Sequence, residues 1–425
     1  MGTDAAPILD PDTYLSGVPH GLLARLRAES AVRWVDEPGG PGFWAVLRHA
    51  ETRRVLRTPG VFSSWLGATQ IRDPAPEALA YTRKMMLNQD PPDHSRLRGL
   101  LTKAFTPRAL AAIGERIKGW ARELVGGLRG EFDFAKETAD LPLLTLAEVF
   151  GVPAADRWLM FDWSNRVIGF QDAEYAASAV AGPDVTDLAR AALALRPTPD
   201  AAGAMPDPRT RAGMPDLYAY AHGLGELKRR APGTDVMSTL MSHVDDVGGR
   251  VSIEEFENLF WLFSVAGNET LRNGIPGGLV ALMSYPDTYR ALKADRSLLP
   301  GAVEEMLRWW TPVMHFRRTA TVDTELAGTR IDAGDKVVVW FSSANRDERA
   351  FAEPDAFDVT RAPNDHLSFG HGPHFCLGAH LARVQLRAVM NAVLDLPGLL
   401  VPAGEPARLR SNFQNGLKRL PVRLS

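Results

Sequence analysis

The spacing of apolar residues changes from a helical to a strand-like period along the chain. From about residue 95 to 310, apolar positions recur every three to four residues, which predicts helices. Short apolar or alternating runs cluster near residues 32–47, 316–341 and 409–425, and these predict strands. The sequence contains no internal repeat. The pattern therefore predicts a mostly α protein with a small β region, an α+β fold.

Local signals support the prediction of strands. Residues 39–42 read Gly-Gly-Pro-Gly, a turn that would pair Arg33-Trp34-Val35 with the apolar run at 43–46. Val338-Val339-Trp340 is a further short strand by the same criteria. Between residues 196 and 216 five prolines interrupt an alanine-rich stretch, which cannot form one regular helix. We expect a long loop there, either a mobile lid or a partly disordered segment.

The only cysteine, Cys376, comes directly before a strongly amphipathic segment. Apolar residues at 377, 381, 384, 388 and 392 share one helical face, and Pro397 ends the helix. Cys376 is thus expected at a helix N-terminus, where free N–H groups and the helix dipole favour thiolate over thiol. We interpret it as a metal ligand. A buried apolar residue and a hydrolase nucleophile are the alternatives.

Zinc is one metal that this region could bind. Four potential nitrogen or sulfur ligands lie within ten residues, namely His371, His374, Cys376 and His380. In that alternative the chain would be a zinc-stabilised binding protein without redox chemistry. Such close spacing suits a small metal knuckle.

The length and composition are those of one large protein of enzyme size. Its 425 residues carry 48 basic and 51 acidic side chains, a formal charge of −3, which gives no indication of a nucleic-acid partner. The length allows a core around a large cofactor, and with no linker in sight we predict one domain over residues 1–425. One cysteine excludes disulfides within the chain, and neither a signal pattern nor a membrane-length apolar run is present. We therefore expect a cytoplasmic protein.

Residues 369–378, Phe-Gly-His-Gly-Pro-His-Phe-Cys-Leu-Gly, resemble the heme-binding signature of the cytochrome P-450 (heme-thiolate) superfamily. The match lies in the spacing of Phe369, Gly372, Cys376 and Gly378. The resemblance implies a prism-like helical domain around heme b, with the Cys376 thiolate as axial ligand. A thiolate pushes electron density onto iron and favours O–O cleavage. The glycines would let the backbone turn sharply and approach the flat macrocycle.

An apolar helical run ends in Ala266-Gly267-Asn268-Glu269-Thr270, which resembles the oxygen-activation motif of the same superfamily. The resemblance implies that Ala266 and Gly267 leave room for dioxygen, while Thr270 and Glu269 relay protons. The alternative is a buried helix with an incidental glycine and a threonine bonded to its own backbone. Leu271 replaces the second threonine of many relatives, which indicates a differently arranged relay. Pro276 predicts a bend beyond Thr270.

Further motifs follow in the order that the family has along the chain. Glu305 and Arg308, three residues apart on one helix face, would join Arg361 in a structural cluster without a role in the chemistry. The resemblance also implies partners for the heme propionates, for which solvated surface charges are the alternative. These partners are His94, Arg98, Arg318 and His374.

The residues expected at the substrate pocket are mainly apolar, which indicates a greasy substrate of modest size. The alternative is that half of them only pack the core. The apolar candidates are Trp65, Ile71, Met85, Met86, Trp261, Val265, Val313, Met314 and Phe413. The polar candidates are His315, Asn412 and Gln414.

The resemblance implies a bacterial monooxygenase that inserts one atom of O2 into a terpenoid, sterol, fatty acid or aromatic natural product. Residues 163–165, 266–273 and 410–416 resemble the branch acting on sterols, terpenoids, branched fatty acids and alkanes. An alternative is a heme-thiolate enzyme that couples or rearranges substrates, or is driven by peroxide.

Electrons must come from other chains, because no flavin, nicotinamide or iron–sulfur signature is present. We expect ferredoxin and a ferredoxin reductase as partners. An acidic ferredoxin could bind a basic face, for which an ordinary solvated surface is the alternative. Its candidate residues are Arg96, Lys103, Arg108, Arg383 and Arg387.

Overall fold

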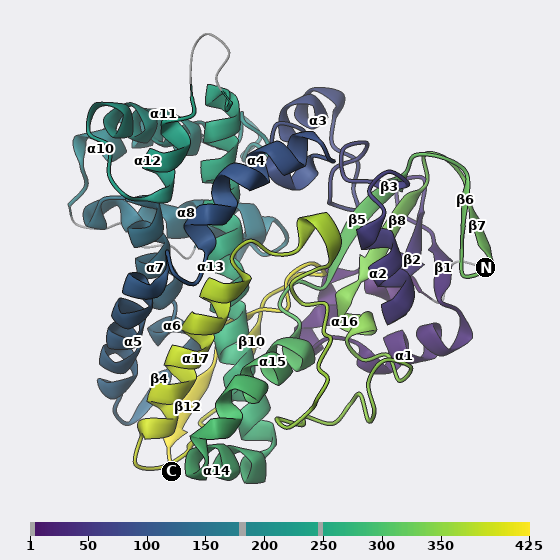
Figure 1. Ribbon diagram of the computed structural model, residues 1–425, viewed down its shortest axis with the longest axis vertical. Coiled ribbons are helices and arrows are strands. Elements are labelled where there is room, and N and C mark those ends of the chain that lie inside the picture. The colour runs from purple at the N-terminus through teal and green to yellow at the C-terminus, as the bar shows by residue number, and fades with distance from the viewer. Residues whose placement is uncertain (1–4, 178–183, 245–249) are drawn as a thin grey trace. The chain divides into compact units, whose positions relative to one another are not determined.

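The structure is a computed structural model that describes residues 5–177, 184–244 and 250–425 (Figure 1). The chain divides into two compact units. Unit 1 comprises Met1–Asp73, Gly114–Leu141 and Thr270–Ser425, and unit 2 comprises Pro74–Ile113 and Pro142–Glu269. The prediction of one catalytic domain over residues 1–425 concerns both units together and stays a prediction.

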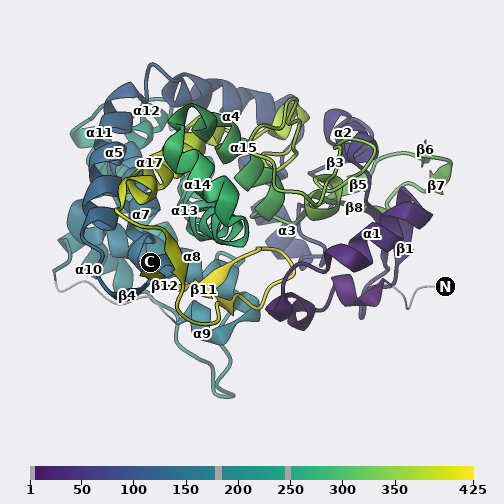
Figure 2. The ribbon, with the colours of Figure 1, turned by 90° about the horizontal axis from the view of Figure 1, so that it is seen from below.

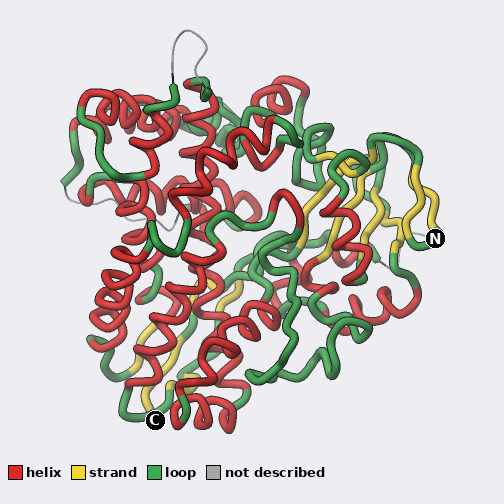
Figure 3. Tube along the Cα trace, viewed as in Figure 1, coloured by secondary structure: helices red, strands yellow, loops and turns green. Residues whose placement is uncertain are grey.

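Every strand named in the structure belongs to unit 1 (Figure 3). The largest sheet has the strand order β1-β2-β8-β5-β3. Its strands are β1 (Val32–Val35), β2 (Phe43–Val46), β8 (Lys336–Trp340), β5 (His315–Ala320) and β3 (Phe62–Ser63). Strands β1 and β2 pair antiparallel with Val35 opposite Phe43, which confirms the hairpin predicted around residues 39–42.

Three smaller sheets are found in the described part of the chain, and the predicted class of mostly helical protein with few strands is confirmed. Strand β12 (Pro421–Leu424) pairs with both β4 (Glu131–Asp133) and β9 (Leu400–Pro402), and Figure 2 shows β12 beside β4. The other two sheets are hairpin-like pairs. They join β6 (Thr324–Leu326) with β7 (Thr329–Ile331) and β10 (Ala407–Arg408) with β11 (Leu417–Arg419).

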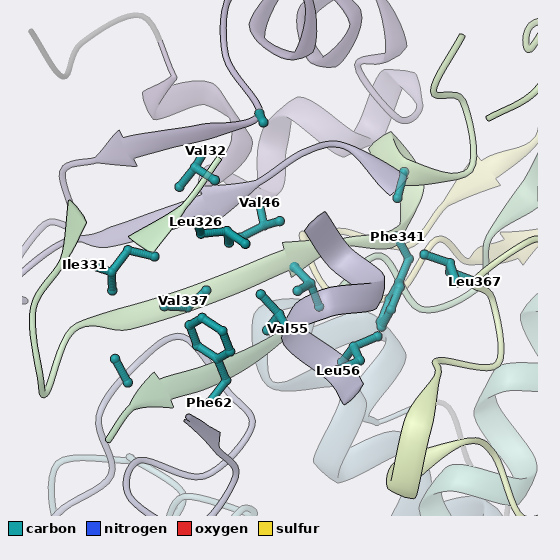
Figure 4. Packing of buried hydrophobic residues seen from close by; sticks show 14 residues of the cluster. Val32, Val46, Val55, Leu56, Phe62, Leu326, Ile331, Val337, Phe341 and Leu367 are labelled. Carbon is teal, nitrogen blue, oxygen red and sulfur yellow. The ribbon is translucent and has the colours of Figure 1, made fainter. Parts of the chain in front are cut away.

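Strand β8 is buried on both of its faces, which explains its uninterrupted apolar sequence. Val337 and Val339 face one hydrophobic cluster, to which helix α2 (His49–Arg57) contributes Val55 (Figure 4). Val338 and Trp340 belong to a second cluster. Because successive side chains of a strand point to opposite faces, this short strand joins both clusters.

Unit 1 also contains several helices, which are joined by loops. The further ones are α1 (His20–Glu29), α5 (Ala111–Gly126), α6 (Phe134–Glu137), α14 (Pro286–Ala294), α15 (Leu299–Trp310), α16 (Phe341–Ala344) and α17 (Ala379–Asp395). Helix α17 ends just before Pro397, as predicted, but it begins three residues after Cys376. The cysteine therefore lies in the loop before the helix, because Gly378 is the N-cap residue.

Unit 2 consists of helices joined by loops. They are α3 (Pro76–Thr82), α4 (Asp93–Thr102), α7 (Asp140–Phe150), α8 (Arg157–Ile168), α9 (Ala173–Ala176), α10 (Asp187–Leu193), α11 (Pro215–Arg230), α12 (Val236–Met241) and the first part of α13 (Ile253–Ser284). Among the described residues, no helix combines the length and apolar character needed to cross a membrane.

Helix α13 continues through Pro276 to Ser284, so this proline does not end the helix. Its continuation is explained by close packing within unit 1. A Cβ atom on Gly277 would lie 2.2 Å from the ring of Trp310, which means that α13 and α15 touch at this point. Such packing can stabilise a helix that local propensity alone would interrupt.

The proline-rich segment follows α10 and runs into the first two residues of α11; residues 196–214 contain neither helix nor strand, and the whole segment is described. Its two ends are fixed to helix α8. Arg196 forms an ion pair with Asp162 at 2.6 Å, and Asp216 accepts a hydrogen bond from the Trp163 ring nitrogen at 3.0 Å. Between these ends, Arg211 forms an ion pair of 2.6 Å with Glu257 on α13. The segment is thus held to unit 2 by several polar contacts.

Candidate active site

The loop that carries Cys376 is folded back on itself by backbone hydrogen bonds. The N–H of Cys376 donates to the carbonyl of Phe369 at 2.9 Å, and the N–H of Phe375 donates to the carbonyl of Gly372 at 3.0 Å. The Cys376 thiol is exposed, and so is the Phe375 ring, at 40%. An exposed thiol beside an exposed aromatic ring is the kind of surface that a flat apolar group bound through iron would cover.

The two glycines of this loop differ in whether the surrounding structure requires a glycine. Gly372 has a φ of +71°, and a Cβ there would lie 2.4 Å from the backbone oxygen of Leu56. Both the conformation and the close approach require glycine. A Cβ on Gly378 meets no atom within 4 Å. Gly378 is therefore not required by the protein's own packing, and its open side leaves room for another group.

Ion pairs and a cation–π contact stabilise the Cys376 loop. Arg383 on α17 binds both carboxylate oxygens of Glu304 at 2.7 Å, and its guanidinium lies 4.5 Å from the centroid of the Phe369 ring. His366 contacts the same carboxylate at 3.2 Å. Burial tends to raise the pKa of Glu304, but the hydrogen bonds from His366 and Arg383 outweigh it and lower that pKa to about 2. Sequence analysis missed Glu304.

Two further predicted residues of the heme site belong to unit 1. His374 Nε2 lies 3.4 Å from the hydroxyl of Ser64. Arg318 on β5 is 4% exposed, and it donates a hydrogen bond to the carbonyl of Arg317. The neighbouring Arg317 forms an ion pair with Asp73 at 2.6 Å, so its charge is already compensated. The exposed thiol, the open side of Gly378, the cationic group of Arg318 and the imidazole of His374 fit a heme.

Glu305, Arg308 and Arg361 come together as a buried cluster. Arg308 binds Glu305 through two hydrogen bonds of 2.7 and 2.8 Å, and both side chains are 0% exposed. Arg361 Nε lies 3.2 Å from the same carboxylate, which also accepts from the Asp358 N–H at 2.9 Å. Arg308 further donates to the carbonyls of residues 345, 354 and 356. The cluster thereby ties α15 to the loop after α16.

Helix α13 carries the other predicted motif. Ala266 is exposed and Thr270 half-buried, and their spacing of four residues puts them on one helix face. A Cβ on Gly267 would lie 2.6 Å from Leu146 of α7, so this glycine lets two helices of unit 2 approach closely. Glu269 is fully buried. Its carboxylate accepts hydrogen bonds from the hydroxyl of Ser164 at 2.9 Å and from that of Tyr175.

Comparison with known proteins decides the family. Residues 225–406 match the family model described as Cytochrome P450. The chain is 35% identical to a steroid C26-monooxygenase of Rhodococcus jostii over 97% of its own length and 83% of the relative's. The chain belongs to the cytochrome P450 family.

Other relatives agree. The P450 is 37% identical to a methyl-branched lipid omega-hydroxylase of Mycobacterium tuberculosis, over 95% of this chain and 91% of that protein. A Mycobacterium marinum cytochrome P450 solved with pseudoionone matches with a TM-score of 0.81 and 35% identity, over 95% of this chain and 94% of that one. The protein is therefore a P450 monooxygenase of bacterial type, an oxidoreductase, and its cofactor is a heme-thiolate iron.

The zinc alternative is wrong. Membership of the P450 family contradicts a binding protein without redox chemistry. The geometry agrees, because nowhere in residues 5–177, 184–244 and 250–425 do three or more His, Cys, Asp or Glu side chains gather to hold a metal ion. The histidines 371, 374 and 380 therefore do not join Cys376 in a zinc site.

Unit 2 of the P450 holds the remaining predicted heme partners and part of the predicted pocket. His94 and Arg98 lie one turn apart on α4, with His94 2% exposed. Met85, Met86 and Val265 are buried, at 5–7% exposure. Trp261 is half-buried.

In unit 1, the predicted pocket residues differ in burial. Trp65 is 39% exposed, Val313 is half-buried and Phe413 is 8% exposed. Ile71 and Met314 instead belong to the hydrophobic cluster around Trp340. For these two, the structure agrees with the alternative that they pack the core.

The predicted polar contacts all belong to unit 1. The Asn412 amide donates to the backbone oxygen of Leu9 at 2.6 Å. Gln414 is 3% exposed. His315 is buried beside the rings of Trp340 and Phe413, at centroid distances of 4.8 and 5.4 Å. Burial lowers the pKa of His315 to about 3, so that its imidazole is neutral at physiological pH.

Two of the five basic residues proposed for a ferredoxin face already have acidic partners. Arg96 forms an ion pair with Glu255, and Arg383 binds Glu304 as described. Lys103 and Arg108 are exposed. This leaves fewer uncompensated charges in the predicted basic face than the sequence indicated.

Proposed function

We propose that this P450 hydroxylates an apolar sterol-, terpenoid- or branched-lipid-like substrate. The observation that carries the proposal is identity of 35–37%, over almost the whole chain, to a steroid monooxygenase and a branched-lipid hydroxylase. The overall reaction would be RH + O2 + 2 e− + 2 H+ → ROH + H2O. Ferredoxin and a ferredoxin reductase would supply the electrons in the cytoplasm, where a lone thiolate ligand stays reduced.

The proposed cofactor is heme b with Cys376 as the axial ligand. When bound, it supplies the activation of O2 for insertion of one oxygen atom into a C–H bond. Arg318 and His374 would bind the propionates, because their cationic or N–H groups suit a carboxylate. The assignment of His94 and Arg98 to the same role rests on the sequence match.

The loop around the ligand would have three separate tasks. Gly372 shapes the turn, and Gly378 keeps the space beside the thiolate open. The backbone carbonyl of Phe369 accepts a hydrogen bond from the Cys376 N–H, and the Phe369 ring stacks with the Arg383 guanidinium. Together these contacts would keep the sulfur at a fixed position, as a metal ligand needs.

Thr270 and Glu269 would deliver protons to the oxygen site. The Thr270 hydroxyl would pass a proton to this site, and Glu269 would return a proton to Thr270. Ala266, small and exposed on the same face as Thr270, leaves space for dioxygen. Without ordered proton delivery, O2 would instead leave as hydrogen peroxide, after uptake of the same two electrons and two protons.

The substrate would be held mainly by shape. Trp65, Val313 and Phe413 in unit 1, with Met85, Trp261 and Val265 in unit 2, are the apolar residues that we assign to this role. Met314 is left out because it packs in a core cluster. For the ferredoxin, Lys103, Arg108 and Arg387 are the basic residues that we assign.

The first experiment is the absorption spectrum of the purified protein after reduction and treatment with carbon monoxide. Only thiolate-ligated ferrous heme gives the strongly red-shifted Soret band. We expect that band in the natural protein and its loss in Cys376→Ser. A protein with heme but without that band would contradict the assignment of Cys376.

Substrate binding is tested by the spin-state shift of the heme with a steroid, a methyl-branched fatty acid and a terpenoid ketone. The compound with the largest shift is then turned over with NADH and a surrogate ferredoxin system under 18O2. We expect a product heavier by one labelled oxygen atom. A coupled or rearranged product without label would favour the alternative heme-thiolate chemistry.

A further inference from the structure

Glu269 is a buried carboxylate whose two oxygens are both engaged within unit 2. Ser164 on α8 donates to Oε1 at 2.9 Å, and Tyr175 on α9 donates to Oε2. Glu269 and Ser164 are 0% exposed and Tyr175 is 4% exposed. A buried carboxylate needs such donors, because removal from water otherwise strongly disfavours it. The two donors therefore fix where the carboxylate points.

The two hydroxyls come from neighbouring elements that are themselves held in place. Tyr175 lies in a four-residue helix whose N-terminus is capped by Asp172, the side chain of which accepts the Tyr175 N–H at 3.2 Å. The turn after α8 passes so close to α9 that a Cβ on Gly169 would lie 2.6 Å from the backbone nitrogen of Ala176. Tyr175 consequently has little freedom to move away from α8 and Ser164.

The kind of donor matters for a proton relay. A hydroxyl both donates and accepts hydrogen bonds, so it can hold the carboxylate and still take part in proton exchange with it.

We propose that Ser164 and Tyr175 are positioning residues that hold the Glu269 carboxylate for proton delivery to Thr270. This inference rests on the proposed function. Neighbours in a helix point about 100° apart, so the direction of the Glu269 carboxylate has to be set by its own hydrogen-bond partners. The hydroxyls of Ser164 and Tyr175 set that direction.

The test compares Tyr175→Phe and Ser164→Ala with the natural protein in NADH-driven turnover. The probe is the compound that gives the largest spin-state shift among the steroid, the branched fatty acid and the terpenoid ketone. Misplacement by about 1 Å can cost about 100-fold in rate, so loss of one of these hydrogen bonds should lower product formed per NADH about threefold to tenfold. Hydrogen peroxide should rise by the missing amount, and the solvent deuterium isotope effect should increase.

Tyr220→Phe is the matched control. Tyr220 is fully buried in the same unit, and its hydroxyl donates to the carboxylate of Asp156 at 2.9 Å. The change therefore removes the same kind of hydrogen bond without touching Glu269. We expect unchanged product per NADH and an unchanged isotope effect. If Tyr220→Phe uncouples as strongly as Tyr175→Phe, the effect is general loss of packing and the inference fails.

A second measurement needs no turnover. The infrared carboxylate band of Glu269 is identified in the purified protein as the band lost in Glu269→Gln. We expect Tyr175→Phe and Ser164→Ala to shift it, because each removes a hydrogen bond, whereas Tyr220→Phe leaves it in place. An unshifted band in both variants overturns the hydrogen bonds on which the inference depends.

Thr270→Ala separates the inference from the proposed function. If Thr270→Ala and Glu269→Gln uncouple the enzyme but Tyr175→Phe and Ser164→Ala do not, only the positioning role is wrong. If Thr270→Ala leaves coupling unchanged, the relay in the proposed function is wrong and the positioning role falls with it.

Discussion

Replacing Glu305 by glutamine tests how much the buried cluster of unit 1 contributes to stability. The amide would keep the shape of the side chain but remove the negative charge that Arg308 and Arg361 share. Burial alone would raise the pKa of Glu305, yet the Arg308 hydrogen bond and charge lower it, so the carboxylate is charged in the folded protein. Breaking a fully buried pair costs about 3–5 kcal/mol, because the remaining charge stays buried.

The expected change in melting temperature follows from the size of the chain. An unfolding entropy of about 2.1 cal/mol/K per residue gives about 0.9 kcal/mol/K for 425 residues. A loss of 3–5 kcal/mol then lowers the melting temperature by about 3–6 °C. The assay is thermal unfolding of the heme-containing protein, followed by far-ultraviolet circular dichroism. The decrease in melting temperature should persist at high salt, because dissolved ions screen buried ion pairs only weakly.

Glu115→Gln is the control for this experiment. Glu115 and Lys118 have the same spacing of three residues as Glu305 and Arg308, and their distance is 2.7 Å, but the Glu115 side chain is 76% exposed. Exposed pairs of this kind contribute little, so we expect no measurable change. The reasoning is refuted if Glu305→Gln melts within about 1 °C of the natural protein, or if both variants lose the same stability.

Two further predictions concern the Cys376 loop and a buried histidine. Gly372→Ala should lower heme content and melting temperature, because this glycine has a positive φ and its Cβ would meet the Leu56 backbone. Gly378→Ala should leave the melting temperature of the heme-free protein unchanged. Heme absorbance and thermal unfolding measure these effects, and equal effects of the two variants would contradict the reasoning. For His315, with a folded pKa of about 3 against about 6.5 unfolded, the unfolded chain alone binds a proton between these values. Stability from this residue is complete above about pH 6.5 and falls by about 1.4 kcal/mol per pH unit toward pH 3, so urea unfolding of His315→Phe should show a correspondingly flatter pH dependence.

Local patterns predicted the local parts of the molecule. The glycine and proline turn at residues 39–42 predicted the β1–β2 hairpin, because turn and strand signals there lie within fifteen residues. The family signature around Cys376 was equally visible, since its residues are contiguous. Helices α1 and α2 were not predicted. Each is too short to show a sustained helical spacing of apolar residues, and its apolar residues follow its packing against other elements of unit 1.

Contacts between distant segments could not be predicted. Glu304 binds Arg383, which is 79 residues further along the chain, and Ser164 is 105 residues from Glu269. No spacing rule connects such positions in one sequence. Met314 shows the same limit: the sequence cannot distinguish an apolar residue that lines a pocket from one that packs in a core cluster.

The anchored ends of the proline-rich segment have a consequence for engineering. Arg196 and Asp216 fix both ends to α8, so the residues between them form an insert with two defined attachment points in addition to the Arg211–Glu257 ion pair. Doubling the length of a flexible loop costs only about 0.6 kcal/mol in closure entropy. Between these two attachment points, the insert can therefore be lengthened at little cost in stability, which makes it a suitable place for inserted sequences.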